Sequence, residues 1–297
     1  MLVRIALAAL FLVAGCTAPP RPADAPRDAE RPEWAQAFTA VDGQGTFVLF
    51  YPATGRTERH DPARAARRYL PASTFKLYNA LVALDAGVVT DVDSLWAWDG
   101  VERSIPAWNR DHSLRTGMAA STVWLYQRLA GRVGRERYAA AFAREPYGNA
   151  VTGDTLAQFW LDNSLRISAD EQVRFADRLR TGRTGFSDAA EWAVREIVPV
   201  LAERPGARLL GKTGWGGFSG APGVRTQLGW VVGWVERPAA AGDDVVFALN
   251  VEPLSGAAGA GFEMGPARLA IATAILEAEG MLPPAGPSPA GDAQRAN

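Results

Sequence analysis

Segments with the pattern of β-strands lie near both ends of the chain and enclose a middle part with helical spacing. Three segments are rich in aromatic and β-branched residues and are bounded by turn residues: Thr46–Tyr51, Leu228–Glu236 and Val245–Val251. A short loop of proline, alanine, glycine and aspartate joins the last two, which predicts an antiparallel pair. The terminal segments are therefore expected to meet in one sheet.

Apolar residues recur at helical spacing in three further segments: Ser73–Asp85, Ser121–Leu129 and Pro266–Glu279. The last has proline in its first turn and is followed by Gly280, residue types that favour the start and the end of a helix. We expect an α/β fold in which helices pack on an antiparallel sheet. A helical lobe is inserted between the terminal strands.

The composition excludes several classes of protein. The chain has 297 residues, of which 48% are hydrophobic and 21% charged, as in a folded globular protein rather than a disordered, collagenous or coiled-coil chain. Its formal net charge of -1 gives no general basic surface for nucleic acid. Cys16 is the only cysteine and His60 and His112 are the only histidines, so we expect neither an intrachain disulfide nor a metal site.

The two ends of the chain differ in pattern from the part between them. Residues 1–15 have an arginine, an apolar run too short to span a bilayer, and small residues before Cys16, which predicts a signal peptide. The string Val13–Cys16 resembles the bacterial lipobox, so we expect Cys16 to be lipidated; the alternative is a stray cysteine in an uncleaved helix. We expect a proline-rich tether over 16–33, a folded domain over 34–282 and a disordered tail over 283–297. The expected location is the periplasmic face of the outer membrane.

Lysine is nearly absent from the chain. It occurs only at positions 76 and 212, and every other basic residue is arginine. Arginine stays protonated in proteins, whereas a buried lysine can lose its proton and act as a base or nucleophile. The pattern indicates a chemical role for Lys76 and Lys212, although a chance pair of leftover codons is an alternative.

Both lysines lie in short motifs that can carry chemistry. Ser73 and Lys76 are three residues apart at the start of a predicted helix, so their side chains share one face and can touch. Lys212-Thr213-Gly214 places a cation, a hydroxyl and a glycine at an expected strand end. Alone, each motif also fits a purely structural interpretation. S-x-x-K could be a capping serine with a surface lysine, and K-T-G could belong to a glycine-rich loop. Together, S-x-x-K and K-T-G are typical of serine β-lactamases and penicillin-binding proteins.

From Gly45 to Leu282 the chain resembles the class D serine β-lactamases, the oxacillinases. Several strings carry this resemblance: Pro71–Lys76, Ser121-Thr122-Val123, Tyr147-Gly148-Asn149, Phe159-Trp160-Leu161, the strand Gly229–Glu236, and Arg268 near the start of the last helix. The resemblance implies the fold shared by serine β-lactamases and penicillin-binding transpeptidases. It also implies hydrolysis of penicillin- and cephalosporin-type antibiotics without a metal, and thereby antibiotic resistance.

The resemblance further implies a role for each residue. Ser73 would be the nucleophile and Lys76, carboxylated on its amine by carbon dioxide, the general base. Val123 and Trp160 would form the dry pocket of the carbamate, with the Trp160 N–H holding it. Ser121 would relay a proton to the leaving nitrogen. The substrate would be bound by Lys212, Thr213, Gly214, Trp215 and Arg268, and the site supported by Tyr147 and Asn149. Simple alternatives exist for three of these residues: a helix cap for Ser121, a solvated charge for Arg268 and a core aromatic for Trp160.

Three other functions fit parts of this pattern. A β-lactam sensor that is acylated without turnover would need a transmembrane helix, and no stretch after Cys16 approaches the ~20 apolar residues required. A penicillin-binding transpeptidase is disfavoured by Val123 and the tryptophan string. A lipid-anchored binding protein leaves the lysine pattern unexplained.

Overall fold

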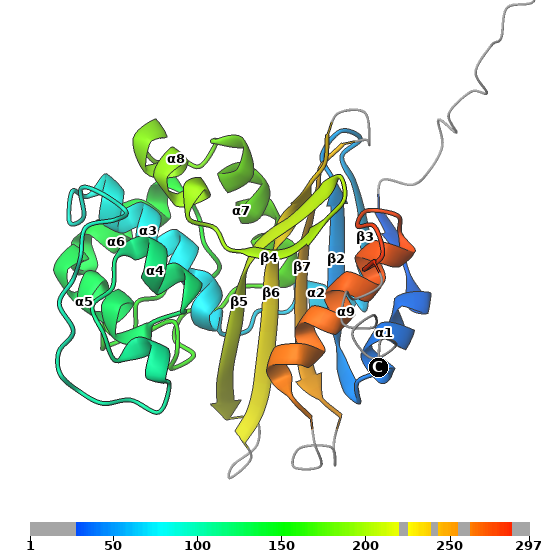
Figure 1. Ribbon diagram of the computed structural model, residues 1–297, viewed down its shortest axis with the longest axis horizontal. Helices are drawn as coiled ribbons and strands as arrows, with labels where there is room; N and C mark the ends of the chain where they lie inside the picture. The colour runs from blue at the N-terminus through cyan, green and yellow to red at the C-terminus, as the bar shows by residue number, and fades with distance from the viewer. Residues whose placement is uncertain (1–27, 220–224, 239–242, 255–261, 287–297) are drawn as a thin grey trace, which may run out of the picture.

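The computed structural model describes residues 28–219, 225–238, 243–254 and 262–286 (Figure 1). The predicted signal peptide, Cys16 and the first part of the predicted tether lie outside these residues, as does most of the predicted tail. Two predicted boundaries lie within these residues, the start of the domain at Trp34 and its end at Leu282. The chain is already a strand at Asp28–Glu30, so the domain begins earlier than predicted.

One sheet runs through the middle of the molecule. Within the described residues it has seven strands in the order β1-β3-β2-β7-β6-β5-β4. Their bounds are β1 Asp28–Glu30, β2 Gly43–Tyr51, β3 Arg56–His60, β4 Val200–Arg204, β5 Ala207–Ser219, β6 Arg225–Glu236 and β7 Val245–Pro253. The predicted hairpin of the last two long strands is confirmed, and the first predicted strand pairs with β7 in antiparallel register, Phe47 opposite Leu249.

The sheet is mixed rather than wholly antiparallel, because β1 lies parallel to β3. Ion pairs hold this short, charged strand in place. The Arg31 guanidinium that follows it pairs with Glu58 on β3 at 2.7 Å and with Glu279, after the last helix, at 2.5 Å. The Trp34 indole also donates to Glu279 at 2.8 Å. Contacts between the two ends of the domain therefore extend it beyond the predicted start.

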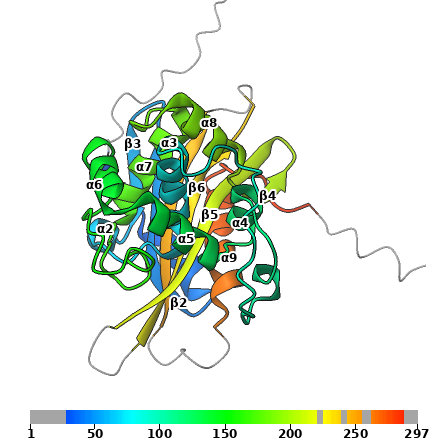
Figure 2. The ribbon, with the colours of Figure 1, turned by 90° about the vertical axis from the view of Figure 1, so that its left-hand side faces the viewer.

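Helices cover both faces of the sheet (Figures 1 and 2). Helices α1 and α9 lie on one face, and the remaining helices form the other layer and the inserted lobe. The α-helices are α1 Ala35–Thr39, α2 Pro62–Ala66, α3 Lys76–Asp85, α4 Leu114–Ala119, α5 Val123–Val133, α6 Arg135–Arg144, α7 Ala169–Thr181, α8 Asp188–Glu196 and α9 Met264–Ala278, with 3-10 turns η1 Pro32–Trp34, η2 Ala72–Phe75 and η3 Pro106–Trp108.

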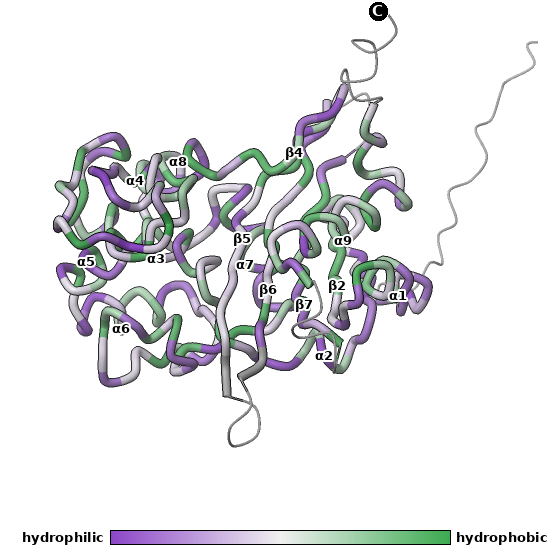
Figure 3. Tube along the Cα trace, turned by 60° about the horizontal axis from the view of Figure 1, so that its bottom comes forward, coloured by the Kyte–Doolittle hydropathy of each residue, from purple (hydrophilic) through white to green (hydrophobic). Residues whose placement is uncertain are grey.

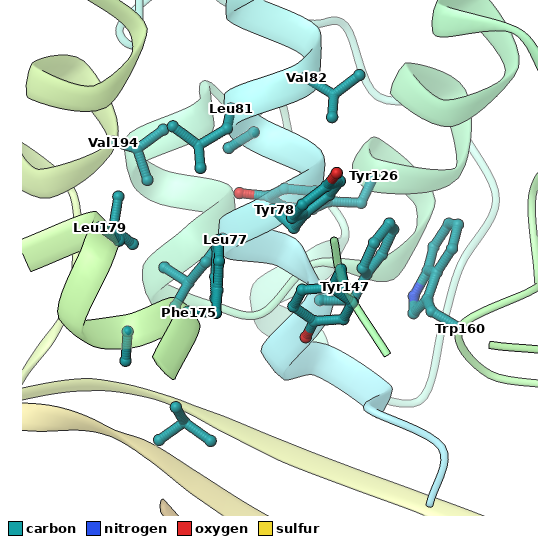
Figure 4. Packing of buried hydrophobic residues seen from close by; sticks show 14 of the residues in the cluster. Leu77, Tyr78, Leu81, Val82, Tyr126, Tyr147, Trp160, Phe175, Leu179 and Val194 are labelled. Atoms are coloured by element: carbon teal, nitrogen blue, oxygen red, sulfur yellow. The ribbon is translucent and has the colours of Figure 1, made fainter. Parts of the chain in front are cut away.

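Alternating strand residues divide the interior into two cores. Phe47 and Leu49 of β2 pack with α9, while Val48 between them belongs to the core shared with the helical lobe. Figure 3 shows hydrophobic stretches along α9 and the neighbouring strands. The lobe core surrounds α3, where the rings of Tyr78 and Tyr147 are 4.9 Å apart (Figure 4). Helix α3 is thus fixed on all sides.

No helix in the described part of the chain is long and apolar enough to cross a membrane.

Candidate active site

Ser73 and Lys76 are in contact, as their spacing predicts. Ser73 lies in the 3-10 turn η2 and Lys76 is the first residue of α3, so the predicted helix begins with a tighter turn. The Lys76 Nζ donates to the Ser73 Oγ at 2.6 Å. The Lys76 side chain has no exposure, whereas Ser73 is 9% exposed. Ser73 therefore keeps a small exposed fraction, while the amine beside it is fully shielded from water.

Polar contacts from other helices hold the turn that carries Ser73. Thr74 Oγ1 donates to the Pro71 carbonyl at 2.7 Å and accepts from Gln172 Nε2 on α7 at 2.8 Å. The Tyr147 hydroxyl donates to Gln172 Oε1 at 3.2 Å, so it contacts the residue that holds Thr74. Sequence reasoning missed Gln172. Its signal is a glutamine on a helix face whose other members, such as Val173 and Ala176, are apolar.

The second lysine motif lies alongside the first. Lys212 is in the middle of β5, not at a strand end as expected, and its Nζ donates to Ser121 Oγ at 3.0 Å. Gly214 explains the close approach: a Cβ there would come within 3.0 Å of the Pro71 carbonyl oxygen. The glycine therefore permits the strand to run against η2, because any side chain would push the two apart.

Ser121 joins the two lysines. Its Oγ accepts from Lys212 and, at 3.4 Å, from Lys76. The helix expected from Ser121 begins two residues later, at Val123, and Thr122 occupies the cap position. Ser121 instead has a left-handed backbone, with φ of 55°. The interpretation of Ser121 as a helix cap is therefore wrong.

Burial lowers the pKa values of both amines. Removal from water shifts the pKa of Lys76 well below 10.5, and the neighbouring charge of Lys212 lowers it further. Burial lowers the pKa of Lys212 to about 7, with a smaller contribution from Arg268. Helix α5 adds apolar surface next to Lys76: the ring of Tyr126 lies 5.4 Å from Nζ, and Val123 occupies the first position of the same helix. Burial therefore favours the neutral form of the Lys76 amine.

Trp160 presents an unsatisfied donor in this region. The side chain has no exposure, and no atom of the described residues accepts a hydrogen bond from its Nε1. Its ring stacks on Phe75, the neighbour of Lys76, with centroids 5.5 Å apart, and its carbonyl accepts from the Ala72 N–H at 3.1 Å. Figure 4 shows the indole beside α3. A buried donor without a partner is costly, so this N–H is suited to an acceptor that is absent from the polypeptide.

Asn149 fixes the segment that carries Trp160. Its Nδ2 donates to the Ser164 carbonyl at 2.8 Å, and its Oδ1 accepts from the Arg166 N–H at 2.9 Å. Gly148 has a positive φ, and a Cβ there would clash with the Arg166 carbonyl at 1.9 Å. The Tyr147-Gly148-Asn149 string therefore closes the loop around residue 160.

The open side of the site carries the residues expected to bind substrate. Arg268 Nη1 donates to the Gly214 carbonyl at 2.6 Å, while its Nε has no acceptor among the described residues. Burial lowers the pKa of Arg268 to about 10, so it remains charged at neutral pH. Trp215 is 58% exposed on β5, and Thr213 is half-buried on the same strand. Arg268, and Lys212 in its protonated form, thus offer positive charge at this site.

Groups of three or more His, Cys, Asp or Glu side chains that could hold a metal ion do not occur in the described ranges. The arrangement of an alcohol, a buried amine with a lowered pKa and two basic side chains is suited to nucleophilic attack on a carbonyl compound that carries an anionic group.

The buried amine of Lys212 predicts a pH-dependent change in stability. The folded pKa of about 7 lies below the usual 10.5, so burial costs stability in full below pH 7, and the cost disappears as pH rises towards 10.5. Lys212→Met should therefore melt about 5 °C above the wild type at pH 6, with a smaller difference at pH 9. Thermal unfolding at both values measures this. A difference that is constant or larger at pH 9 would contradict the lowered pKa.

Comparison with known proteins places the chain in one family. Residues 45–277 match the model of the penicillin binding protein transpeptidase domain. The chain is 36% identical to β-lactamase OXA-20 of Pseudomonas aeruginosa over 86% of its own length and 90% of the relative's. It is 36% identical to β-lactamase OXA-48 of Klebsiella pneumoniae over 94% and 99%.

Solved structures agree with these matches. The class D β-lactamase YbXI from Nostoc has a TM-score of 0.74 and 32% identity, covering 84% of this chain and 99% of that one. The C-terminal domain of the Bacillus licheniformis BlaR penicillin-receptor has a TM-score of 0.75 and 30% identity, covering 86% and 98%. The expected transpeptidase and β-lactamase fold is confirmed.

Proposed function

Because the chain belongs to the class D β-lactamases, serine hydrolases that open β-lactams, we propose that it does so through a Ser73 ester with carboxylated Lys76 as the base. One observation carries this proposal. Lys76 is fully buried, and burial strongly lowers its pKa. The buried indole of Trp160 stacks on Phe75, the neighbour of Lys76, and its N–H lacks an acceptor in the described structure. A neutral amine can add carbon dioxide, and Trp160 would hold the resulting carbamate.

The arrangement of Lys76 and Trp160 indicates which residues would hold the carbamate and what the carbamate would do chemically. Trp160 would donate to it, and Val123 and Tyr126 would exclude water from it. When formed, the carbamate supplies a general base for both half-reactions, since its carboxylate oxygens can accept a proton from an alcohol or from water.

The chain's own residues perform the other steps. Ser73 Oγ attacks the lactam carbonyl carbon, and the backbone N–H groups of Ser73 and Trp215 stabilise the oxyanion. The carbon–nitrogen bond breaks, and Ser121, which contacts both lysines, passes a proton to the departing nitrogen. Water then cleaves the ester, returning the proton to Ser73 and releasing the ring-opened acid.

Lys212 and Arg268 would bind the carboxylate that penicillins and cephalosporins carry, together with Thr213 and Gly214. Arg268 can bind it bidentately, because its Nε and Nη2 are not used in the protein contact with Gly214. This cationic side of the site accounts for specificity towards anionic β-lactams.

The likeness to the BlaR penicillin-receptor domain favours one second candidate, a receptor that keeps its ester. Nitrocefin, a chromogenic cephalosporin, separates the two. We expect steady hydrolysis over many turnovers by the purified protein, because burial shields Lys76 and favours its neutral form. One equivalent of product followed by a stop would support the receptor and contradict the enzyme.

We also propose that the mature protein is exported and anchored through lipid on Cys16, at the periplasmic face of the outer membrane. The support is the sequence pattern before Cys16. Expression of the full chain should put the wild type in the membrane fraction and the Cys16→Ser variant in the soluble fraction. A soluble wild type would contradict the anchor.

A further inference from the structure

Ser121 lies in an unusual backbone turn between two helices. Helix α4 ends in a Schellman motif: the Ser121 N–H donates to the Met118 carbonyl at 3.2 Å, and the Thr122 N–H to the Gly117 carbonyl at 2.9 Å. The left-handed residue of such a motif is usually glycine, because a Cβ is disfavoured there. With φ of 55°, Ser121 needs support from surrounding structure to keep this conformation.

That support comes from Trp108, at the end of the turn η3. Its indole Nε1 donates to the Ala120 carbonyl at 2.8 Å. This carbonyl lies in the peptide unit that leads into Ser121, and the last carbonyls of a helix lack partners within it. The bond therefore fixes the peptide plane from which the Ser121 side chain is oriented.

A second indole holds Trp108 in place. Trp124, in the first turn of α5 and only 2% exposed, donates its Nε1 to the Trp108 carbonyl at 2.8 Å. Trp108 is thus bonded to residue 120 on one side of Ser121 and to residue 124 on the other. We propose that Trp124 and Trp108 are positioning residues that clamp Ser121 at hydrogen-bonding distance from both lysine amines.

This inference rests on the proton-relay role proposed for Ser121. Ser121 Oγ accepts hydrogen bonds from Lys76 at 3.4 Å and from Lys212 at 3.0 Å. It can keep both only if its backbone rotates little. Without the clamp, Ser121 samples other orientations, and the leaving nitrogen is protonated more slowly. The loss falls on the chemical step rather than on substrate binding.

Phenylalanine substitutions test the clamp, since they keep a ring and remove the N–H. Trp124→Phe and Trp108→Phe should each lower kcat for nitrocefin about tenfold, with KM changed less than about twofold. Trp98→Phe is the matched control. The Trp98 indole belongs to the same segment as Trp108 but donates to the Val101 carbonyl at 3.1 Å, away from Ser121. Its kcat should stay within about twofold of the wild type.

A double-mutant cycle separates positioning from general packing. In a Ser121→Ala protein, Trp124→Phe should cost less than about twofold in kcat, because the residue it positions is gone. A full tenfold loss in that background, or equal effects of Trp124→Phe and Trp98→Phe, would overturn the clamp. Wild-type kcat in Ser121→Ala alone would instead contradict the proton relay, and the clamp with it. If Trp124→Phe does not fold, Trp108→Phe gives the same test.

Discussion

Lys76→Arg is expected to lower kcat for nitrocefin by at least about a thousandfold, although it keeps a long basic side chain. Lys76 has no exposure, and burial strongly lowers its pKa, which favours the neutral amine. A guanidinium does not lose its proton in proteins and cannot become a carbamate. Without a base, neither formation nor hydrolysis of the Ser73 ester is assisted.

The other lysine of the chain provides the matched control. Lys212 is 2% exposed, so Lys212→Arg makes the same change in an equally buried place. Its proposed work is to bind a carboxylate and contact Ser121, which a permanent cation can still do. We expect a loss of about tenfold to a hundredfold. Turnover of Lys76→Arg equal to that of Lys212→Arg would contradict Lys76 as the base.

Trp160→Phe should make the enzyme dependent on added bicarbonate. The substitution keeps an aromatic ring in a fully buried place but removes the N–H proposed to hold the carbamate. We expect kcat to fall about thirtyfold in buffer freed of carbon dioxide, which is the size expected for the loss of one buried charge-assisted hydrogen bond. Addition of about 50 mM bicarbonate should restore most of this loss. Initial rates in the two buffers measure the effect.

Trp234→Phe is the corresponding control. Trp234 is 1% exposed, and its indole donates to Glu236 at 3.1 Å at the far end of β6. Its rate should respond to bicarbonate as the wild type does. If Trp160→Phe and Trp234→Phe respond equally, the Trp160 N–H does not hold a carbamate.

Local spacing predicted the part of the site that depends on one helical turn. The contact of Ser73 with Lys76 follows from their separation of three residues, even though η2 is a 3-10 turn. The contact of Ser121 with Lys212 does not follow from spacing, because the two residues are joined only by the packing of β5 against the lobe. The resemblance to class D β-lactamases predicted that both residues belong to one site, and the structure places their side chains in contact.

The errors have physical causes. Lys212 was expected at a strand end but lies in the middle of β5, because Gly214 lets a long strand run against η2. The helix at Ser121 was placed too early because the sequence gives no glycine to mark the Schellman turn. Strand β1 was missed because its three residues have no apolar pattern and depend on ion pairs of Arg31 with distant carboxylates.

The most direct test of the account is ¹³C NMR of the enzyme in ¹³C-labelled bicarbonate. Carboxylation of Lys76 predicts one slowly exchanging carbamate resonance in the wild type, kept in Lys212→Arg, weakened in Trp160→Phe and absent from Lys76→Arg. An active wild type without this resonance, or a resonance that survives Lys76→Arg, would contradict carboxylated Lys76 as the base.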